Sequence, residues 1–374
     1  MSKRIIALLL ACMMTVGLLS ACGSEPTTTD TNTNTDANTD TTADPNAGGD
    51  TAGSDAPAAN DPKQTIMFAH WYAEDHPQHQ ALLKFQELLD EYSGGSLELQ
   101  IYPNSQLGSE DTFIDSVKQG TVQMGATGTM IAKYDPVIYA EETPFLFEGW
   151  DDAKEVLTGD LSHYITDDFE AASGMKIAAI TVNGFRQFSS NKTMNSIEEF
   201  EGQRIRVPNV PNYIEMVEAL GASPIAMSLT DLFTALEQNS VDGQDNPYPT
   251  DWSSSFYEVQ DYILESNHMF SPANWVINAN FYNNTLTDAQ REAFDKAIAE
   301  AAEYNWEISE QANEEAKQNL IDAGVEITVP DEAYKAQLQE AMEPVYEEWY
   351  FSEVEGSEEF IKAVWEYQGK EVAE

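Results

Sequence analysis

Short strand-like and helix-like segments alternate along the chain from residue 65 onward, and this alternation limits the fold more than any other feature. Thr65–His70 is an apolar run of strand length, and Pro77 opens a segment with apolar residues at helical spacing that ends at Gly94 and Gly95. A strand, a helix and another strand are then expected at residues 97–101, 111–118 and 122–126. Strands separated by single helices form βαβ units, so the pattern predicts an α/β fold with a mostly parallel sheet.

The same alternation continues in the second half of the chain. The expected strands are 175–182, 204–207 and 275–279, and the expected helices are 213–220 and 229–236. Thr287 is a candidate N-cap for a helix that runs to about Leu320, which at 1.5 Å per residue would be about 50 Å long. Residues 334–350 and 358–367 are predicted to form closing helices.

The first 62 residues predict export and anchoring rather than folding. Lys3 and Arg4 precede an apolar run to Leu19, as in a secretory signal peptide, here assigned to residues 1–21. Leu19-Ser-Ala-Cys22 resembles a bacterial lipobox, in which the cysteine is lipidated; an ordinary signal peptide with an incidental cysteine is the alternative. Residues 22–62 are predicted to be the lipidated Cys22 and a disordered, acidic, Thr-rich tether. The protein would be held on the outer face of the cytoplasmic membrane.

The charge balance limits the partners. Lys and Arg number 18 against 65 Asp and Glu, which gives a formal net charge of −47. A chain this acidic is repelled by phosphate backbones, so we expect no nucleic-acid partner, and self-repulsion favours a monomer.

Catalytic and cofactor motifs are missing from the sequence. It has no G-x-S-x-G elbow, no phosphate-binding glycine loop and no H-E-x-x-H pair, so we expect no enzyme activity and no cofactor. His76 and His79 have a ligand-like spacing, but nothing else in the sequence supports a metal site, and none is predicted. The pairs Glu141/Glu142 and Asp151/Asp152 could serve glycoside hydrolysis, but are interpreted as solvated surface. Because such carboxylate pairs could serve hydrolysis, an exported hydrolase acting on acidic sugars is kept as an alternative.

Three of the five arginines fall within 21 residues and point to an anion site. Arg186 is expected at the exit of the strand 175–182. Arg204 and Arg206 alternate along the next strand, which Pro208 ends, so they should point to opposite faces and only one can face a given cleft. Guanidinium groups match carboxylates, and the repulsive field of the whole chain favours a small anion captured in a closed cleft. Surface ion pairs are the alternative interpretation of each arginine.

Several ordered blocks then resemble the DctP family, the solute-binding proteins of tripartite ATP-independent periplasmic (TRAP) transporters. The blocks are Asn183-Gly-Phe-Arg-Gln187, Gly202-Gln-Arg-Ile-Arg-Val-Pro-Asn209, Leu220-Gly-Ala-Ser-Pro224 and Val241-Asp-Gly-Gln-Asp-Asn-Pro247. The resemblance implies a two-lobe, type II-like periplasmic-binding-protein clamshell with a long bracing helix. The lobes would be 63–184, with 275–286 returning to it, and 185–274, followed by the bracing and C-terminal helices over 287–374.

The resemblance also implies the site and the partners. Arg206 would pair with the ligand carboxylate, supported by Arg186, and Asn246 and Asn209 would add polar contacts. Further candidates are Thr127, in a segment where sialic-acid-binding relatives carry a glutamate, and the aromatic faces of Trp71, Tyr248 and Trp252. The partners would be the small and large TRAP membrane subunits, although a receptor for ATP-driven import has a similar architecture. A C4-dicarboxylate is the first choice of ligand, and a sugar acid or hydroxy acid is the alternative.

Overall fold

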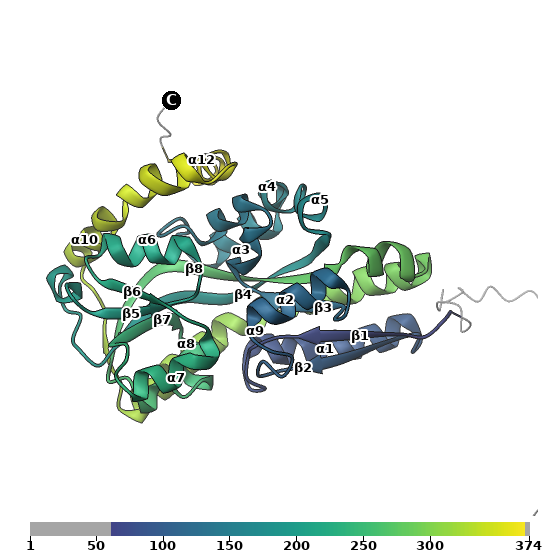
Figure 1. Ribbon diagram of the computed structural model, residues 1–374, viewed down its shortest axis with the longest axis horizontal. Coiled ribbons are helices and arrows are strands. Elements are labelled where there is room, and N and C mark those ends of the chain that lie inside the picture. Colours follow the sequence, from purple (N-terminus) through teal and green to yellow (C-terminus); the bar gives the residue numbers. More distant parts are fainter. Residues whose placement is uncertain (1–60, 371–374) are drawn as a thin grey trace, which may run out of the picture. The chain divides into compact units, whose positions relative to one another are not determined.

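The computed structural model describes residues 61–370 (Figure 1). The predicted signal peptide, the lipidation site Cys22 and all but the last two residues of the predicted tether lie outside the described residues. Among the described residues, no helix is both long enough and apolar enough to cross a membrane.

The described residues build one nine-stranded sheet of order β2-β1-β3-β8-β4-β7-β5-β6, with β9 added beside β8. The strands are β1 Gln64–Ala69, β2 Leu97–Tyr102, β3 Met124–Thr127, β4 Met175–Ser190, β5 Arg204–Val207, β6 Ser223–Ala226, β7 Gly243–Pro247, β8 Tyr262–Asn278 and β9 Glu326–Thr328. Five of the eight pairings are parallel, as predicted, but the longest pairing, between β4 and β8, is antiparallel. The sheet is therefore mixed.

The two long strands β4 and β8 run through both halves of the sheet, and both are longer than predicted. The strand predicted to end at Val182 continues to Ser190, and the strand predicted to begin at Trp275 begins at Tyr262. Asn183-Gly184 resembles a turn in the sequence, but Gly184 has a φ of 125° and the chain passes it in a β-bulge without leaving the sheet. Arg186 consequently lies inside β4 and not at its exit.

Twelve α-helices are described within residues 61–370. They are α1 Pro77–Ser93, α2 Glu110–Gln119, α3 Trp150–Thr158, α4 His163–Thr166, α5 Phe169–Ser173, α6 Pro211–Ala219, α7 Leu229–Glu237, α8 Tyr248–Ser253, α9 Asp288–Ala323, α10 Glu332–Met342, α11 Phe351–Glu353 and α12 Ser357–Tyr367. The helix predicted over 334–350 is interrupted, because α10 ends at Met342 and a π-helical turn occupies Tyr346–Tyr350. The helix predicted over 358–367 is confirmed as α12.

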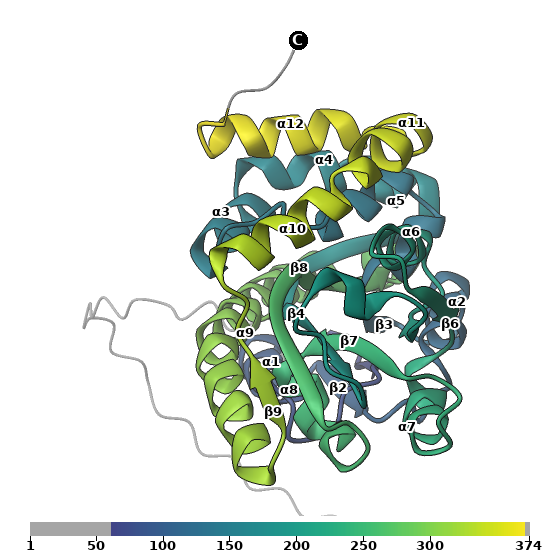
Figure 2. The same cartoon turned by 90° about the vertical axis from the view of Figure 1, so that its left-hand side faces the viewer.

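The 36-residue helix α9 braces the two lobes, as predicted. Thr287 caps it through a capping box with Gln290, in which each side chain bonds the other residue's backbone N–H. Helix α9 contacts α1 and β4 towards one end of the sheet and α8 towards the other (Figures 1 and 2). The proposed lobe boundaries at residues 184 and 274 fall within β4 and β8, the strands that the two lobes share.

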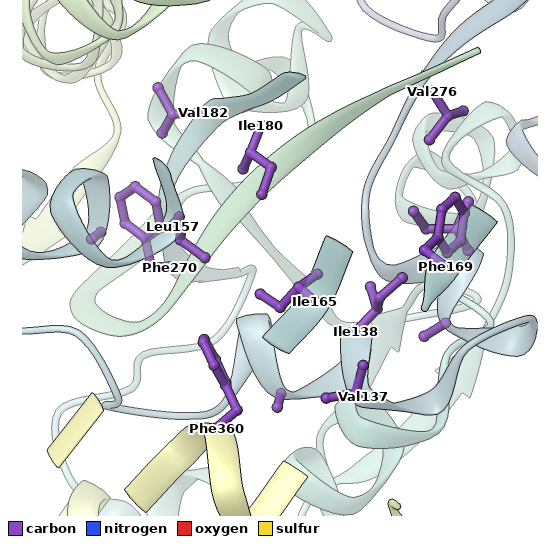
Figure 3. Close-up of a cluster of buried hydrophobic side chains, with 14 of the residues drawn as sticks. Val137, Ile138, Leu157, Ile165, Phe169, Ile180, Val182, Phe270, Val276 and Phe360 are labelled. Atoms are coloured by element: carbon purple, nitrogen blue, oxygen red, sulfur yellow. The ribbon is translucent and has the colours of Figure 1, made fainter. Parts of the chain in front are cut away.

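The C-terminal helices belong to both lobes. Tyr334, Leu338 and Met342 of α10 pack in a core with Tyr213 and Val217 of α6. The side chains of α12 enter another core, which also contains helices α3–α5 and the inner faces of β4 and β8; Figure 3 shows Phe360 of α12 in this cluster with Leu157, Ile165, Phe169, Ile180, Val182 and Phe270. Figure 2 shows α10 and α12 along the same side of the molecule as α6 and α3–α5. The segment 332–367 therefore links the two lobes a second time.

Candidate ligand-binding site

A cavity of about 100 Å³ lies where the lobes meet. Five of the eight predicted ligand-binding residues line it: Trp71, Arg186, Arg206, Asn209 and Asn246. They come from the segment after β1, from β4, from β5 and the segment after it, and from β7. The carboxyl ends of β1 and β5 thus open onto the cavity, which is the usual place for a ligand in an α/β sheet.

Three predicted residues do not line this cavity. The Tyr248 hydroxyl donates a hydrogen bond to Glu265 (2.8 Å), and the Tyr248 ring is buried against Ala316 and Leu320 of α9. Trp252 stacks on Tyr257 with ring centres 4.7 Å apart. Neither aromatic ring lines this cavity, because α8 lies against α9 and both rings pack there.

Thr127 is turned away from the cavity. Its hydroxyl donates to the Glu110 carboxylate at 2.6 Å, and the side chain is fully buried. Thr127 therefore acts on the cavity only through Glu110, which does line it.

The alternation along β5 is confirmed. The Arg204 side chain is 41% exposed and pairs with Asp242, with Nη2 2.9 Å from Oδ1, whereas Arg206 is 3% exposed and faces the cavity. The Arg206 atoms Nε and Nη2 both donate to the carbonyl of Met227, at 3.1 and 2.8 Å. No carboxylate among residues 61–370 forms an ion pair with Arg206. Burial lowers its pKa to about 10, so the guanidinium stays charged at neutral pH without an acidic partner.

Arg186 differs from Arg206 because its charge is already compensated. Its Nε donates to Asp245 Oδ2 at 2.6 Å, and its Nη2 donates to the Asp245 carbonyl. The Asp245 carboxylate is fully buried, and the pKa of that carboxyl is held well below its usual range because the Arg186 charge and a contact with His268 outweigh the effect of burial. The Arg186 guanidinium carbon also lies 4.8 Å from the centre of the Tyr213 ring. The cavity therefore has one cation with a carboxylate partner and one without.

Three acidic residues line the cavity: Asp111, which is half-exposed and pairs with Lys133, and the more buried Glu110 and Glu142. The sequence interpretation missed Glu110 and Glu142. Glu142, interpreted as solvated surface together with Glu141, is 1% exposed; its oxygens accept hydrogen bonds from Thr129 and Ser271. Glu110 accepts from Thr127 and from the backbone N–H of Gly128 at 2.9 Å. Burial raises the pKa of both carboxyls, and for Glu142 the nearby Arg186 charge opposes the rise. The available signal was that Glu141-Glu142 lies between two apolar runs, 137–140 and 144–147.

Three histidines lie close to the cavity and form no metal site. His76 Nδ1 accepts from the backbone N–H of Gln78 and caps α1, and His70 Nε2 lies 3.1 Å from His79 Nδ1. Burial lowers the pKa of His70 and His76 to about 3, so both are neutral near pH 7. Among residues 61–370, no group of three or more His, Cys, Asp and Glu side chains is placed to hold a metal ion.

Comparisons with known proteins agree with this geometry. The family model of bacterial extracellular solute-binding protein, family 7 (DctP), matches residues 68–353. A crystal structure of a TRAP periplasmic solute-binding protein from Haemophilus influenzae with bound L-gulonate is 34% identical with a TM-score of 0.78, and the match covers 81% of this chain and 99% of that chain.

Two further relatives are each 29% identical to this chain. One is the 2,3-diketo-L-gulonate-binding periplasmic protein YiaO of Escherichia coli, matched over 82% of this chain and 92% of its own length. The other is the C4-dicarboxylate-binding periplasmic protein DctP of Rhodobacter capsulatus, matched over 76% of this chain and 85% of its own length.

Proposed function

This chain belongs to family 7 of the bacterial extracellular solute-binding proteins, the DctP family, and we propose that its ligand is a sugar acid or a similar hydroxylated monocarboxylate. Members of the family are receptors without catalytic activity, which removes the exported hydrolase as an alternative. The protein is a TRAP solute receptor for small organic acid anions, and the family implies the TRAP membrane subunits as its partners.

The observation that carries the proposal is that Arg206 is the single cavity arginine without an acidic partner among residues 61–370. One ligand carboxylate can pair with Arg206 through the guanidinium edge that faces the cavity. A second carboxylate would need the charge of Arg186, which Asp245 already compensates. Burying a carboxylate without a cation or several donors costs several kcal/mol, so this arrangement favours a monoanion over a dicarboxylate.

The rest of the lining suits hydroxyl groups. Asn209, Asn246 and the carboxyl groups of Glu110 and Glu142 can exchange hydrogen bonds with hydroxyls at several positions of a ligand. The indole Nε1 of Trp71 is buried and has no hydrogen-bond partner among the described residues, so a ligand oxygen could satisfy it. A short dicarboxylate without hydroxyls would leave most of these groups unpaired.

The relatives support both ligand classes, with more weight on the sugar acids. The H. influenzae structure, at 34% identity, contains L-gulonate, and the E. coli relative is described as binding 2,3-diketo-L-gulonate. The R. capsulatus relative, described as binding C4-dicarboxylates, is 29% identical. The sequence interpretation favoured a C4-dicarboxylate; the charge arrangement and these relatives favour its alternative.

A thermal-shift screen tests the proposed ligand class. The panel contains galactonate, gluconate, glucuronate, lactate, malate, succinate and the neutral sugar galactose. A ligand at 100 times its dissociation constant stabilises the folded state by about 2.7 kcal/mol, so a true ligand raises the melting temperature clearly. We expect one or more sugar acids to stabilise the protein more than succinate or malate. Stabilisation by succinate alone would restore the dicarboxylate, and stabilisation by galactose alone would contradict the role of Arg206.

We propose in addition that the receptor is exported and anchored through lipidated Cys22, followed by the tether to residue 62. This proposal rests on the sequence signals before Cys22, which lie outside the described residues. Replacement Cys22→Ser should release the protein into the soluble fraction outside the cytoplasm, measured by immunoblotting of membrane and soluble fractions. Continued membrane retention of the variant would contradict the anchor.

A further inference from the structure

Glu142 is a buried acid in the wall of a cavity that takes an anion. It ends the 3₁₀ helix Pro136–Glu142, and its two carboxyl oxygens accept from the hydroxyls of Thr129 and Ser271, each at 2.5 Å. All three side chains line the cavity. Because both hydroxyls donate to the carboxyl group, the observed bonds suit the anionic form, which accepts at both oxygens.

The backbone around Glu142 is held in place from three sides. The Glu142 carbonyl accepts from the hydroxyl of Tyr350 (2.9 Å) and from the amide Nδ2 of Asn212 in α6 (3.3 Å). Two residues on, the Pro144 carbonyl accepts from the hydroxyl of Tyr346. The next residue, Phe145, has a φ of 54° and donates its N–H to a carbonyl of β8 at 2.8 Å. Three separate elements therefore hold the backbone of the segment, while Thr129 and Ser271 hold the carboxylate itself.

A fixed negative charge at this place changes what the cavity can accept. A monoanion pairs with Arg206 and leaves only neutral hydroxyls near Glu142, where the carboxylate can accept from them. A dianion would place its second carboxylate in a cavity whose other arginine, Arg186, is already paired with Asp245. Like charges at close range in a water-poor cavity repel strongly, and such repulsion is an effective means of rejecting a wrong partner.

We propose that Glu142 is the specificity-determining residue of this receptor: its fixed carboxylate rejects dianions and selects monocarboxylates that carry hydroxyl groups. This inference rests on the proposed function, since it explains how the site distinguishes a sugar acid from a dicarboxylate. The inference also gives the C-terminal segment a role in positioning Glu142, because the Tyr350 hydroxyl donates a hydrogen bond to the Glu142 carbonyl.

The neighbouring Glu141 provides a matched control. It is also fully buried, and its Oε1 accepts from the amide of Asn274 at 2.7 Å, but it does not line the cavity. Replacement of either glutamate by glutamine keeps the side-chain volume and removes one acid. Only the replacement at Glu142 removes a charge from the cavity wall.

The test compares two six-carbon ligands that differ in one end group. Galactonate carries one carboxylate, and galactarate carries a second carboxylate in place of the terminal hydroxymethyl group. Dissociation constants are measured by isothermal titration calorimetry at pH 8 for the wild type, Glu142→Gln and Glu141→Gln. We expect Glu142→Gln to shift the affinity ratio towards galactarate by at least about tenfold, and Glu141→Gln to change it less than about threefold.

An unchanged ratio in a folded Glu142→Gln variant would overturn the inference, as would an equal shift in both variants. If Glu142→Gln does not fold, as judged by its melting curve, a variant with Tyr350→Phe takes its place: it keeps the Glu142 charge but removes the Tyr350 hydrogen bond to the Glu142 carbonyl. Because Asn212 still bonds the same carbonyl, Asn212 is replaced by Ala in the same variant; the ratio should then move towards galactarate about two- to fivefold, and no change would overturn the inference. If the wild type itself prefers galactarate, or binds neither of these two ligands nor any sugar acid or hydroxy acid of the thermal-shift panel, the proposed function fails. If it prefers galactonate and the variants do not alter the ratio, only the role of Glu142 fails.

Discussion

The cavity has a positively charged wall and a negatively charged wall, and the charged groups of the two walls differ in their bonding partners. The arginine wall consists of Arg186 on β4 and Arg206 on β5. The acid wall is defined as the two lining acids without an ion-pair partner among residues 61–370, Glu110 at the start of α2 and Glu142 at the end of the 3₁₀ helix Pro136–Glu142; the third lining acid, Asp111, pairs with Lys133. In the arginine wall one cation is paired and one is not. In the acid wall, both carboxyls accept from hydroxyl or backbone N–H donors and neither forms an ion pair within residues 61–370.

The difference indicates that the two walls have different roles in ligand binding. Arg206 supplies attraction at one point, and the two acids limit which anions can use it. A receptor in so acidic a chain needs both, because an arginine alone would accept any anion that fits the cavity. The predictions below test each wall in turn.

The largest effect should follow from changing Arg206. Loss of one partner of a desolvated charge pair costs about 2–5 kcal/mol, so Arg206→Ala should weaken sugar-acid binding about 30-fold to several thousandfold. Arg206→Lys should not restore it fully, because an ammonium lacks the planar donor fork. Calorimetric titration measures both variants. If Arg206→Lys binds within about threefold of the wild type, Arg206 is not the bidentate partner of the carboxylate.

Next in size is a stability effect of His76, whose ring centre lies 4.5 Å from that of the cavity-lining Tyr72. The folded-state pKa of His76 is about 3, below its ordinary 6.5, because burial disfavours the imidazolium. The neutral His76 ring therefore makes its full contribution to the unfolding free energy above pH 6.5. As the pH falls from 6.5 towards 3, this contribution decreases by about 1.4 kcal/mol per pH unit. His76→Asn keeps an N-cap acceptor for α1 but removes the titration.

Between pH 7 and pH 5 the wild type should therefore lose about 2 kcal/mol more unfolding free energy than His76→Asn. Urea unfolding followed by circular dichroism at both pH values measures this difference, in which the acids common to both proteins cancel. Equal losses would show that His76 does not stay neutral in the folded protein.

A smaller effect should appear in ligand choice when the acid wall is protonated. Burial raises the pKa of Glu110 and Glu142, so these groups lose their charge at a higher pH than ordinary glutamates, whereas Arg206, with a pKa of about 10, stays charged. From pH 8 to pH 5.5 the preference for galactonate over galactarate should decrease by up to about tenfold, while galactarate, with carboxyl pKa values of about 4, remains a dianion. Glu142→Gln serves as the control and should show less of this pH dependence than the wild type.

The smallest effect should follow from Arg204→Ala. Arg204 lies on the opposite face of β5 and pairs with Asp242 and the carbonyls of Asn239 and Ser240. Its loss should change ligand affinity less than tenfold, because the Arg204 side chain does not line the cavity. A larger loss of affinity would mean that the two faces of β5 are not separated as described.

Part of the fold and of the candidate site could be predicted from local sequence patterns. The period of two along a strand places Arg204 and Arg206 on opposite faces, and the Thr287 capping box starts α9, since both depend on neighbouring residues. The long course of β4 and β8 was missed because Gly184 marks a turn locally, whereas the neighbouring strands hold it in a bulge. The compensation of Arg186 by Asp245, 59 residues away, and the burial of Glu142 depend on tertiary contacts that no local pattern reports.

The central claim is that one uncompensated arginine, Arg206, makes this receptor select a hydroxylated monocarboxylate. The most direct measurement is the ratio of dissociation constants of the wild-type protein for galactarate and galactonate at pH 8, obtained by calorimetry. The account predicts that galactonate binds at least about tenfold more tightly, since a second buried carboxylate finds no free cation. Equal affinity for the two ligands, or tighter binding of galactarate, would contradict it.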